Sequence, residues 1–262
     1  MKKNLIKLGL PMLLLGAILF SASCQKNDPV ADKDKDEEQV EIITPEPDDV
    51  IEEVVIGSND NKSGGIYKAT LVGSTGSVKL VLQGEMKSAY ITFDNTTMVL
   101  PTTDLENWTS GQPISNATFG NGDWKIVFSV NGDGTNPRMD VTIPNHNVLV
   151  IVFKETTQNS VTTYEGQYQA GQGNVSVEGT LNFVITNDTT IKAALKTTDN
   201  EIVVLNGTLK NRNIVMKGSS ALGNITAEGI MDDNGLAFGT FSDIAKDSTY
   251  AVTGNWTSRR TL

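Results

Sequence analysis

The 262-residue chain contains one cysteine and one histidine, and each scarcity excludes a class of chemistry. A single cysteine, Cys24, cannot form an internal disulfide. His146, in IPNHNVL, has neither a second histidine nor a nearby cysteine to complete a zinc or copper site or a Ser/His or Cys/His nucleophile arrangement. We therefore expect no metal and no cofactor, place His146 in a turn or at a strand end, and expect a non-enzymatic protein.

Basic residues are also scarce, with 21 Lys plus Arg against 31 Asp plus Glu and a formal net charge of −10. Binding to nucleic acid releases counterions through clustered Lys and Arg, so no nucleic-acid partner is expected. Much of the acidity lies in residues 24–62, where 4 Lys face 13 acids (4 − 13 = −9) and no aromatic residue occurs. Such a segment buries too little apolar surface to offset its ordering entropy. Residues 24–63 are therefore predicted to be a disordered acidic tether.

A bilayer-spanning apolar run is absent, but a shorter one stands at the N-terminus. Lys2, Lys3 and Lys7 precede the apolar run LGLPMLLLGAILF, and no acid occurs before Cys24. An apolar core of about a dozen residues is too short to cross a bilayer comfortably and is typical of a signal peptide. The sequence predicts a signal peptide over residues 1–23.

The residues before the cysteine, Ser21-Ala22-Ser23-Cys24, resemble a bacterial lipobox. Ser21 stands where leucine is more common, a looser form often found in Bacteroidota. The resemblance implies that Cys24 is lipidated, with palmitate or related acyl chains, and anchors the protein in the outer membrane; two or more chains hold a protein firmly. The alternative is an incidental cysteine after an ordinary cleavage site.

The residues after the cysteine, Gln25, Lys26, Asn27 and Asp28, resemble the Bacteroidota lipoprotein export signal. That resemblance implies display toward the cell exterior, and the alternative is a solvated start to the acidic linker. Asp188-Thr189-Thr190 and Asp247-Ser248-Thr249 resemble the O-glycosylation acceptor pattern of the same phylum. They imply modification at Thr189 and Ser248, although so short a pattern also arises by chance.

From Gly65 onward the hydrophobic pattern has period two, and no window favours an amphipathic helix. In GDWKIVFSV, for example, Trp124, Ile126, Phe128 and Val130 share one face. Turn signals such as Asn131-Gly132 and Asn234-Gly235 separate these runs. The sequence therefore predicts an antiparallel all-β fold.

A unit that places glycine two residues before a bulky side chain recurs in the second half: Gly166-Gln-Tyr168, Gly179-Thr-Leu181, Gly207-Thr-Leu209, Gly239-Thr-Phe241 and Gly254-Asn-Trp256. Small residues beside large ones on an inner face are typical of narrow barrels. The predicted strands are 163–169, 174–185, 190–197, 201–209, 212–217, 224–231, 236–242 and 249–257. Eight such strands can close an up-and-down barrel.

The first half repeats this opening weakly, since Gly65-Ile-Tyr67-Lys-Ala69 matches Gly166-Gln-Tyr168-Gln-Ala170. We predict two tandem β domains, residues 64–158 and 159–262, and keep a single sandwich of about fifteen strands as the alternative. This order of a lipidated cysteine, a tether and β barrels is similar to the architecture of surface lipoproteins of the transferrin-binding and complement-regulator-binding type.

Few side chains suggest a site. Carboxylates for glycoside hydrolysis are available, but their spacing predicts no pair; they are Asp123, Asp133, Asp140, Asp232 and Asp233. The stretch from Asn131 to Thr135 is interpreted as a hairpin turn rather than a calcium loop, because it lacks the sixth-position glycine and the terminal glutamate.

The polar connection from Pro101 to Asp123 carries Trp108, whose ring suits a protein or sugar partner. Trp108, Asp104 and Glu106 are the predicted partner-binding residues. Alternatively, Thr103-Asp104 caps a helical turn and Trp108 folds back on the sheet. The leading hypothesis is a surface lipoprotein that binds a host or environmental protein or glycan; the alternatives are an accessory subunit of an outer-membrane complex and an Asp/Glu-based glycan hydrolase.

Overall fold

The computed structural model describes residues 54–172, 175–221, 223–246 and 251–262. These residues form sixteen β-strands and one short 3-10 turn, η1 (Gly57–Asn59), with no α-helix among them. No helix within these ranges is long and apolar enough to cross a membrane. The prediction of an antiparallel all-β protein is confirmed.

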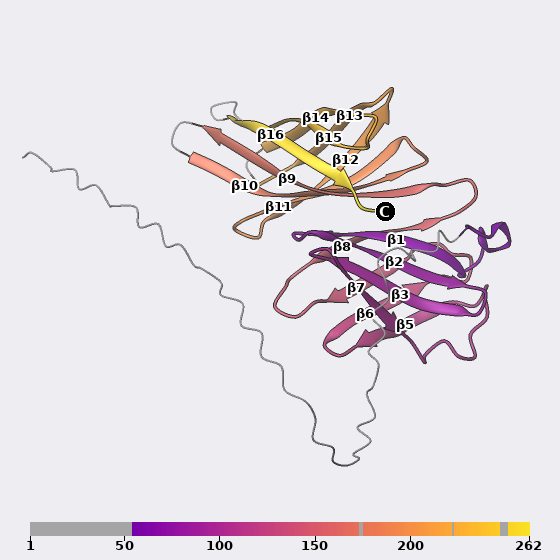
Figure 1. Cartoon of the computed structure of the whole chain (residues 1–262). Coiled ribbons are helices and arrows are strands. Elements are labelled where there is room, and N and C mark those ends of the chain that lie inside the picture. Colours follow the sequence, from indigo (N-terminus) through magenta and orange to yellow (C-terminus); the bar gives the residue numbers. More distant parts are fainter. Residues whose placement is uncertain (1–53, 173–174, 222, 247–250) are drawn as a thin grey trace, which may run out of the picture. The chain divides into compact units, whose positions relative to one another are not determined.

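The first eight strands form two sheets (Figure 1). A five-stranded sheet has the order β4-β3-β2-β1-β8, and a three-stranded sheet has the order β5-β6-β7. The strand bounds are β1 (Gly65–Val72), β2 (Gly76–Gln83), β3 (Met86–Phe93), β4 (Thr96–Pro101), β5 (Ile114–Asn121), β6 (Trp124–Val130), β7 (Arg138–Thr142) and β8 (Leu149–Glu155). We call this half the sandwich.

One hydrophobic core joins the two sheets of the sandwich. Tyr67 and Leu80 from the large sheet and Phe119 and Phe128 from the small one are all fully buried in it. The rings of Tyr67 and Phe128 meet edge to face, with centroids 4.8 Å apart. Along β6 buried residues alternate with partly buried or exposed ones, because successive side chains point to opposite faces of a strand, and the buried face meets the large sheet.

The last eight strands form a closed antiparallel barrel in the order β10-β11-β12-β13-β14-β15-β16-β9. The bounds are β9 (Val161–Gln172), β10 (Val175–Thr186), β11 (Thr190–Thr197), β12 (Ile202–Lys210), β13 (Asn213–Ser219), β14 (Gly223–Met231), β15 (Ala237–Ala245) and β16 (Ala251–Arg260). Each strand pairs with its neighbours in sequence, and β9 closes the ring by pairing with both β10 and β16. The predicted eight-stranded up-and-down barrel is confirmed, and a single fifteen-stranded sandwich is wrong.

Side chains fill the barrel interior, as expected at this strand number. Phe183 and Trp256 lie fully buried in it, and their ring centroids are 6.3 Å apart. Gly229 makes room for Trp256: a Cβ added to Gly229 would lie 2.6 Å from the indole ring. The missing glycine side chain thus allows a large neighbour to enter the narrow core.

Buried and partly buried hydrogen bonds join the sandwich to the barrel. The Thr70 hydroxyl on β1 donates to the backbone carbonyl of Tyr164 on β9 at 3.2 Å, and the Asn182 side chain on β10 donates to the carbonyl of Ser74 at 3.2 Å. Residues Glu52–Leu262 form one compact unit. The division into two domains at residues 158 and 159 therefore stays a prediction.

Lys154, on β8, fixes the segment that leads into β1. Lys154 is only 8% exposed, and its Nζ donates hydrogen bonds to the backbone carbonyls of Asn59, Asp60 and Lys62. Burial lowers the pKa of Lys154, while the carboxylates of Asp60 and Asp133 act in the opposite direction. The start of the described chain is thereby held against the sandwich.

Candidate binding cleft

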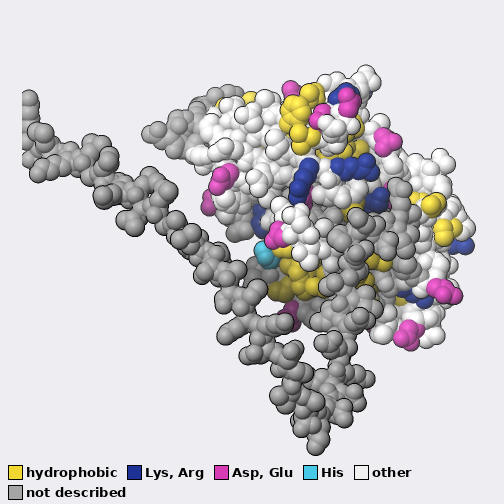
Figure 2. Space-filling model, viewed as in Figure 1, with side chains coloured by type: hydrophobic (Ala, Val, Ile, Leu, Met, Phe, Trp, Pro, Cys, Tyr) yellow, Lys and Arg dark blue, Asp and Glu magenta, His cyan; other side chains and the backbone are white. Residues whose placement is uncertain are grey.

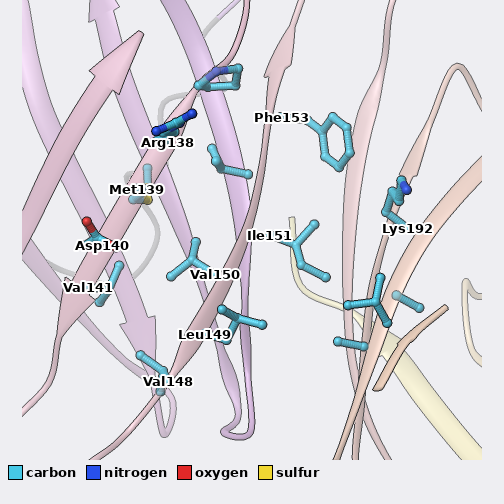
Figure 3. Close-up of a pocket in the computed structure, with 15 residues that line it drawn as sticks. Arg138, Met139, Asp140, Val141, Val148, Leu149, Val150, Ile151, Phe153 and Lys192 are labelled. Atoms are coloured by element: carbon cyan, nitrogen blue, oxygen red, sulfur yellow. The ribbon is translucent and has the colours of Figure 1, made fainter. Parts of the chain in front are cut away.

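A cavity of about 660 Å³ lies where the pairing of the sandwich is interrupted. On one side is β7, from Arg138 to Val141, and on the other is β8, from Leu149 to Phe153 (Figure 3). β7 and β8 are edge strands of their sheets, because each pairs with only one neighbour. Barrel residues of β11 and β12 complete the lining, namely Lys192, Ala193, Ala194 and Val204. We call this cavity the β7–β8 cleft.

The two faces of β8 point to different walls of the cleft. Val150 points toward β7 (Figure 3), and Val150 and Val152 pack against the sandwich core. Leu149, Ile151 and Phe153 point the other way, toward the strand that carries Lys192. Leu149 is 42% exposed, so part of this apolar strand meets solvent.

Residues 148–153 read VLVIVF, the longest unbroken apolar run in the described part of the sequence. Edge strands usually carry charges, prolines or bulges that prevent pairing with another chain. None of these interrupts the run between Val148 and Phe153. The edge of β8 is therefore well suited to pair with another strand.

The other cleft walls contribute charge. On β7, Met139 is buried while Arg138 and Asp140 are exposed. Across the cleft, the exposed Lys192 on the barrel donates a hydrogen bond to the side-chain oxygen of Asn206. Among the residues that the structure describes, neither Arg138 nor Lys192 forms an ion pair. The cleft thus combines apolar walls with two cations, Arg138 and Lys192, and one carboxylate, Asp140.

The shape and the lining of the cleft are suited to binding a ligand. A mostly apolar cavity of several hundred Å³ with a few polar groups is typical of ligand sites. Hydrophobic side chains also reach the surface in separate patches, as Figure 2 shows for one face. Within the described ranges, no cluster of three or more His, Cys, Asp or Glu side chains could hold a metal ion.

A second, more polar cavity of about 330 Å³ holds two carboxylates, Asp94 and Glu165. Glu165 is 6% exposed, and its Oε1 forms an ion pair with the Arg259 guanidinium at 2.7 Å. The Asp94 carboxylate accepts a hydrogen bond from the Thr75 hydroxyl at 2.8 Å. Both carboxylates therefore have structural partners.

Trp108 lies half-buried in the loop between β4 and β5. Its ring packs against the sandwich core, and its Nε1 donates to the carbonyl of Gln112 at 3.0 Å. The Lys87 Nζ lies 5.9 Å from the ring centroid and also donates to the Leu105 carbonyl. The indole ring thus serves a packing role, and its predicted contact with a partner stays a prediction.

The two carboxylates of the same loop lie at its surface. Asp104 accepts a hydrogen bond from the backbone N–H of Thr118 at 2.8 Å, which ties the loop to β5. Glu106 is exposed, and its backbone N–H donates to Thr103 at 3.3 Å. Neither residue lines the β7–β8 cleft, and their role in partner binding stays a prediction.

Several predicted positions lie outside the described residues: Cys24, Gln25, Lys26, Asn27, Asp28 and Ser248. Thr189 is described and lies exposed in the turn between β10 and β11. Its backbone carbonyl accepts a hydrogen bond from Leu209 N–H at 2.7 Å, so its backbone is fixed while its side chain faces solvent. Lipidation, export and glycosylation stay predictions.

The remaining carboxylates and the histidine occupy turns or exposed strand positions. Asp133 accepts hydrogen bonds from the Thr135 N–H and hydroxyl, and Asp232 accepts from two backbone N–H groups of its own turn. Asp233 pairs with Arg212 at 2.7 Å, whereas Asp123 and Asp140 are exposed. His146 lies in a turn, with its ring against that of Phe93 at a centroid distance of 4.7 Å.

No protein-family model matches the chain, and no curated protein sequence matches it. Among solved structures, one described as "Crystal Structure of Surface Lipoprotein" is similar over 75% of this chain and 98% of that chain. The sequence identity is 10% and the TM-score is 0.31. We transfer no residue, ligand or role from it.

Proposed function

We propose that this chain is a lipid-anchored, non-enzymatic binding protein that faces the cell exterior, and that the β7–β8 cleft is its site for a host or environmental protein or glycan. The observation that supports the binding role is the cleft itself, which has apolar walls, two unpaired strand edges, two cations and one carboxylate. The lipobox resemblance at Cys24 and the export-signal resemblance at Gln25–Asp28 support the location.

The location is tested by treating intact cells with a protease. We expect the protein to be digested in intact cells, and expect Cys24→Ser to remove it from the membrane fraction, because acyl chains supply the anchor. A known periplasmic protein serves as the control for cell integrity. Protection of the wild-type protein until the cells are lysed would contradict surface display and favour an accessory subunit on the inner face.

The binding role is tested by a pull-down from serum, mucus and polysaccharide extracts, using the full chain with Cys24→Ser. Leu149→Lys places a charge on the edge strand that lines the cleft, and Val99→Lys makes the same change on β4, at the opposite edge of the same sheet. The two side chains are 42% and 40% exposed, which makes the variants a matched pair. We expect only Leu149→Lys to lose the captured ligand; equal retention in both would exclude the cleft.

A glycan hydrolase is the second candidate, because the polar cavity holds both Asp94 and Glu165. The two carboxylates of such enzymes stand about 5–10 Å apart across the scissile bond. Release of reducing sugar from a polysaccharide panel by the wild type, abolished by Asp94→Asn, would favour this function. No release from any polysaccharide would favour the binding protein.

A further inference from the structure

We infer that the β7–β8 cleft binds an extended strand of a partner polypeptide, which adds to the edge of β8 by backbone hydrogen bonds. This inference rests on the proposed function, since it takes the cleft as the ligand site. It goes further in naming the chemical class of the ligand, a β-strand with apolar side chains and a carboxylate.

The course of the chain supports a strand as the missing element. Each half follows the same eight-strand path, in which the first strand pairs with both the second and the eighth: β1 with β2 and β8, and β9 with β10 and β16. In the barrel the seventh and eighth strands, β15 and β16, also pair through eight residue pairs. In the sandwich the corresponding strands, β7 and β8, have no such ladder. The cleft stands where that ladder would run.

Backbone chemistry favours the same ligand. An edge strand presents a row of N–H and C=O groups, and a partner strand can satisfy that row along its length. β8 spans Leu149–Glu155, an edge of roughly 23 Å at 3.3 Å per residue. A glycan offers no matching row of alternating donors and acceptors, so a polypeptide suits this edge better.

The cleft walls indicate the side chains that the strand would carry. Successive residues of an added strand point to opposite faces. On one face they would meet Met139, Val141 and Val150, and on the other Ala194 and Val204 of the barrel. Apolar walls on both sides favour valine, isoleucine or similar side chains at successive positions.

Charge complementarity adds one more requirement. Arg138 and Lys192 both line the cleft, and no ion pair within the described residues neutralises either. Asp140 is the carboxylate among the lining residues. A partner strand with a glutamate or aspartate at the Arg138 end would place unlike charges together, which favours one orientation.

The test uses fluorescence polarisation with the full chain carrying Cys24→Ser. The probe is a short synthetic peptide of the length of β8, built from valine and threonine with one glutamate. Two further probes have the same side chains. One is N-methylated at the backbone nitrogens of its odd-numbered residues, and the other at those of its even-numbered residues. Methylation removes the donors on one edge of the strand and leaves the side chains in place.

We expect the unmethylated peptide to bind, at least one methylated peptide to bind about tenfold or more weakly, and Leu149→Lys to weaken binding while Val99→Lys does not. Equal binding of all three peptides would overturn strand addition, because side chains alone would then carry the affinity. Absence of peptide binding would also overturn it. In that case, capture of an extract ligand that Leu149→Lys abolishes would leave the proposed function intact.

A further measurement distinguishes binding of a foreign polypeptide from pairing with a second copy of this chain. The oligomeric state is measured by sedimentation with and without the peptide. A dimer that Leu149→Lys dissociates, with no peptide binding, would overturn the inference in favour of edge-to-edge pairing of two copies. A monomer that binds the peptide would support it.

Discussion

The sandwich and the barrel each consist of eight antiparallel strands, and in each half the first strand pairs with the second and the eighth. In the barrel every consecutive pair of strands is hydrogen-bonded, and β9 closes the ring. In the sandwich the pairing is missing between β4 and β5 and between β7 and β8. The closed half has a packed interior, whereas the split half exposes sheet edges beside a cavity.

Local features of the sandwich account for its split. β4 and β5 are joined through residues 102–113, and β7 and β8 through residues 143–148, whereas the barrel strands are joined by shorter turns. β5 also contains a register shift between Ile114 and Ala117, where Asn116 has a φ of 55°. A bulge bends a strand and interrupts its ladder. The longer connections and the bulge thus accompany the open sandwich, and the β7–β8 cleft lies where its ring of strands fails to close.

The largest predicted effect tests whether the two halves unfold together. Trp256→Ala removes the largest fully buried side chain of the barrel, and we expect it to lower the free energy of unfolding by about 3–5 kcal/mol. Because Glu52–Leu262 form one compact unit, denaturant unfolding should remain a single transition. Phe128→Ala in the sandwich is the matched change and should act similarly. Two separate transitions, each moved by only one of the variants, would contradict cooperative unfolding.

The next effect concerns alkaline pH. Burial raises the pKa of Tyr67, Tyr164 and Tyr168, and that of Tyr168 rises to about 12 from 10.0. A raised pKa means that the folded state holds the phenol proton more tightly, so this stabilisation is complete below pH 10 and is lost as pH rises toward 12. For Tyr168 the loss amounts to about 2–3 kcal/mol. Lys154, whose pKa burial lowers, opposes this loss because its stability contribution grows as pH rises toward 10.5.

Tyr168→Phe separates these contributions. We expect the free energy of unfolding of this variant to fall less between neutral pH and pH values above 10 than that of the wild type, since phenylalanine has no proton to lose. The measurement is urea unfolding over a pH series, with tyrosinate absorbance followed in parallel. Identical pH dependence in the two proteins would show that Tyr168 titrates normally in the folded state.

Periodicity predicted the barrel well because its determinants are local. Each predicted strand overlaps an observed one, with ends that differ by a few residues, since hairpin turns and alternating side chains fix both pairing and faces. The matching openings Gly65-Ile-Tyr67 and Gly166-Gln-Tyr168 proved to be the first strands of the two halves, and both tyrosines are buried. The weak repeat therefore marks the strand that pairs with both the second and the eighth strand of its half.

The cleft could not be predicted in the same way. It depends on a ladder that fails to form between β7 and β8 and on barrel residues far away in sequence, such as Lys192 and Val204. One signal was present, the apolar run 148–153, but a buried central strand has the same pattern. Trp108 is an aromatic residue in a polar loop, a pattern that predicts exposure as readily as burial, and its contacts with the core depend on tertiary packing.

The smallest predicted effect compares one closely packed glycine of the barrel with one loosely packed glycine of the sandwich. Gly229, on barrel strand β14, lies against the backbone of Phe238 and the ring of Trp256, and a Cβ there would be 2.6 Å from the ring. A rigid backbone and a fully buried indole cannot shift freely in a closed ring of strands, so Gly229→Ala should lower the free energy of unfolding by about 1–3 kcal/mol.

Gly120, on sandwich strand β5, is the control. A Cβ added there would lie 3.6 Å from the nearest atom, which is an ordinary contact. Gly120→Ala should therefore change the free energy of unfolding by less than about 0.5 kcal/mol. Chemical denaturation of both variants tests the contrast, and equal losses would mean that the close packing around Gly229 makes an added methyl group no more costly than it is at Gly120.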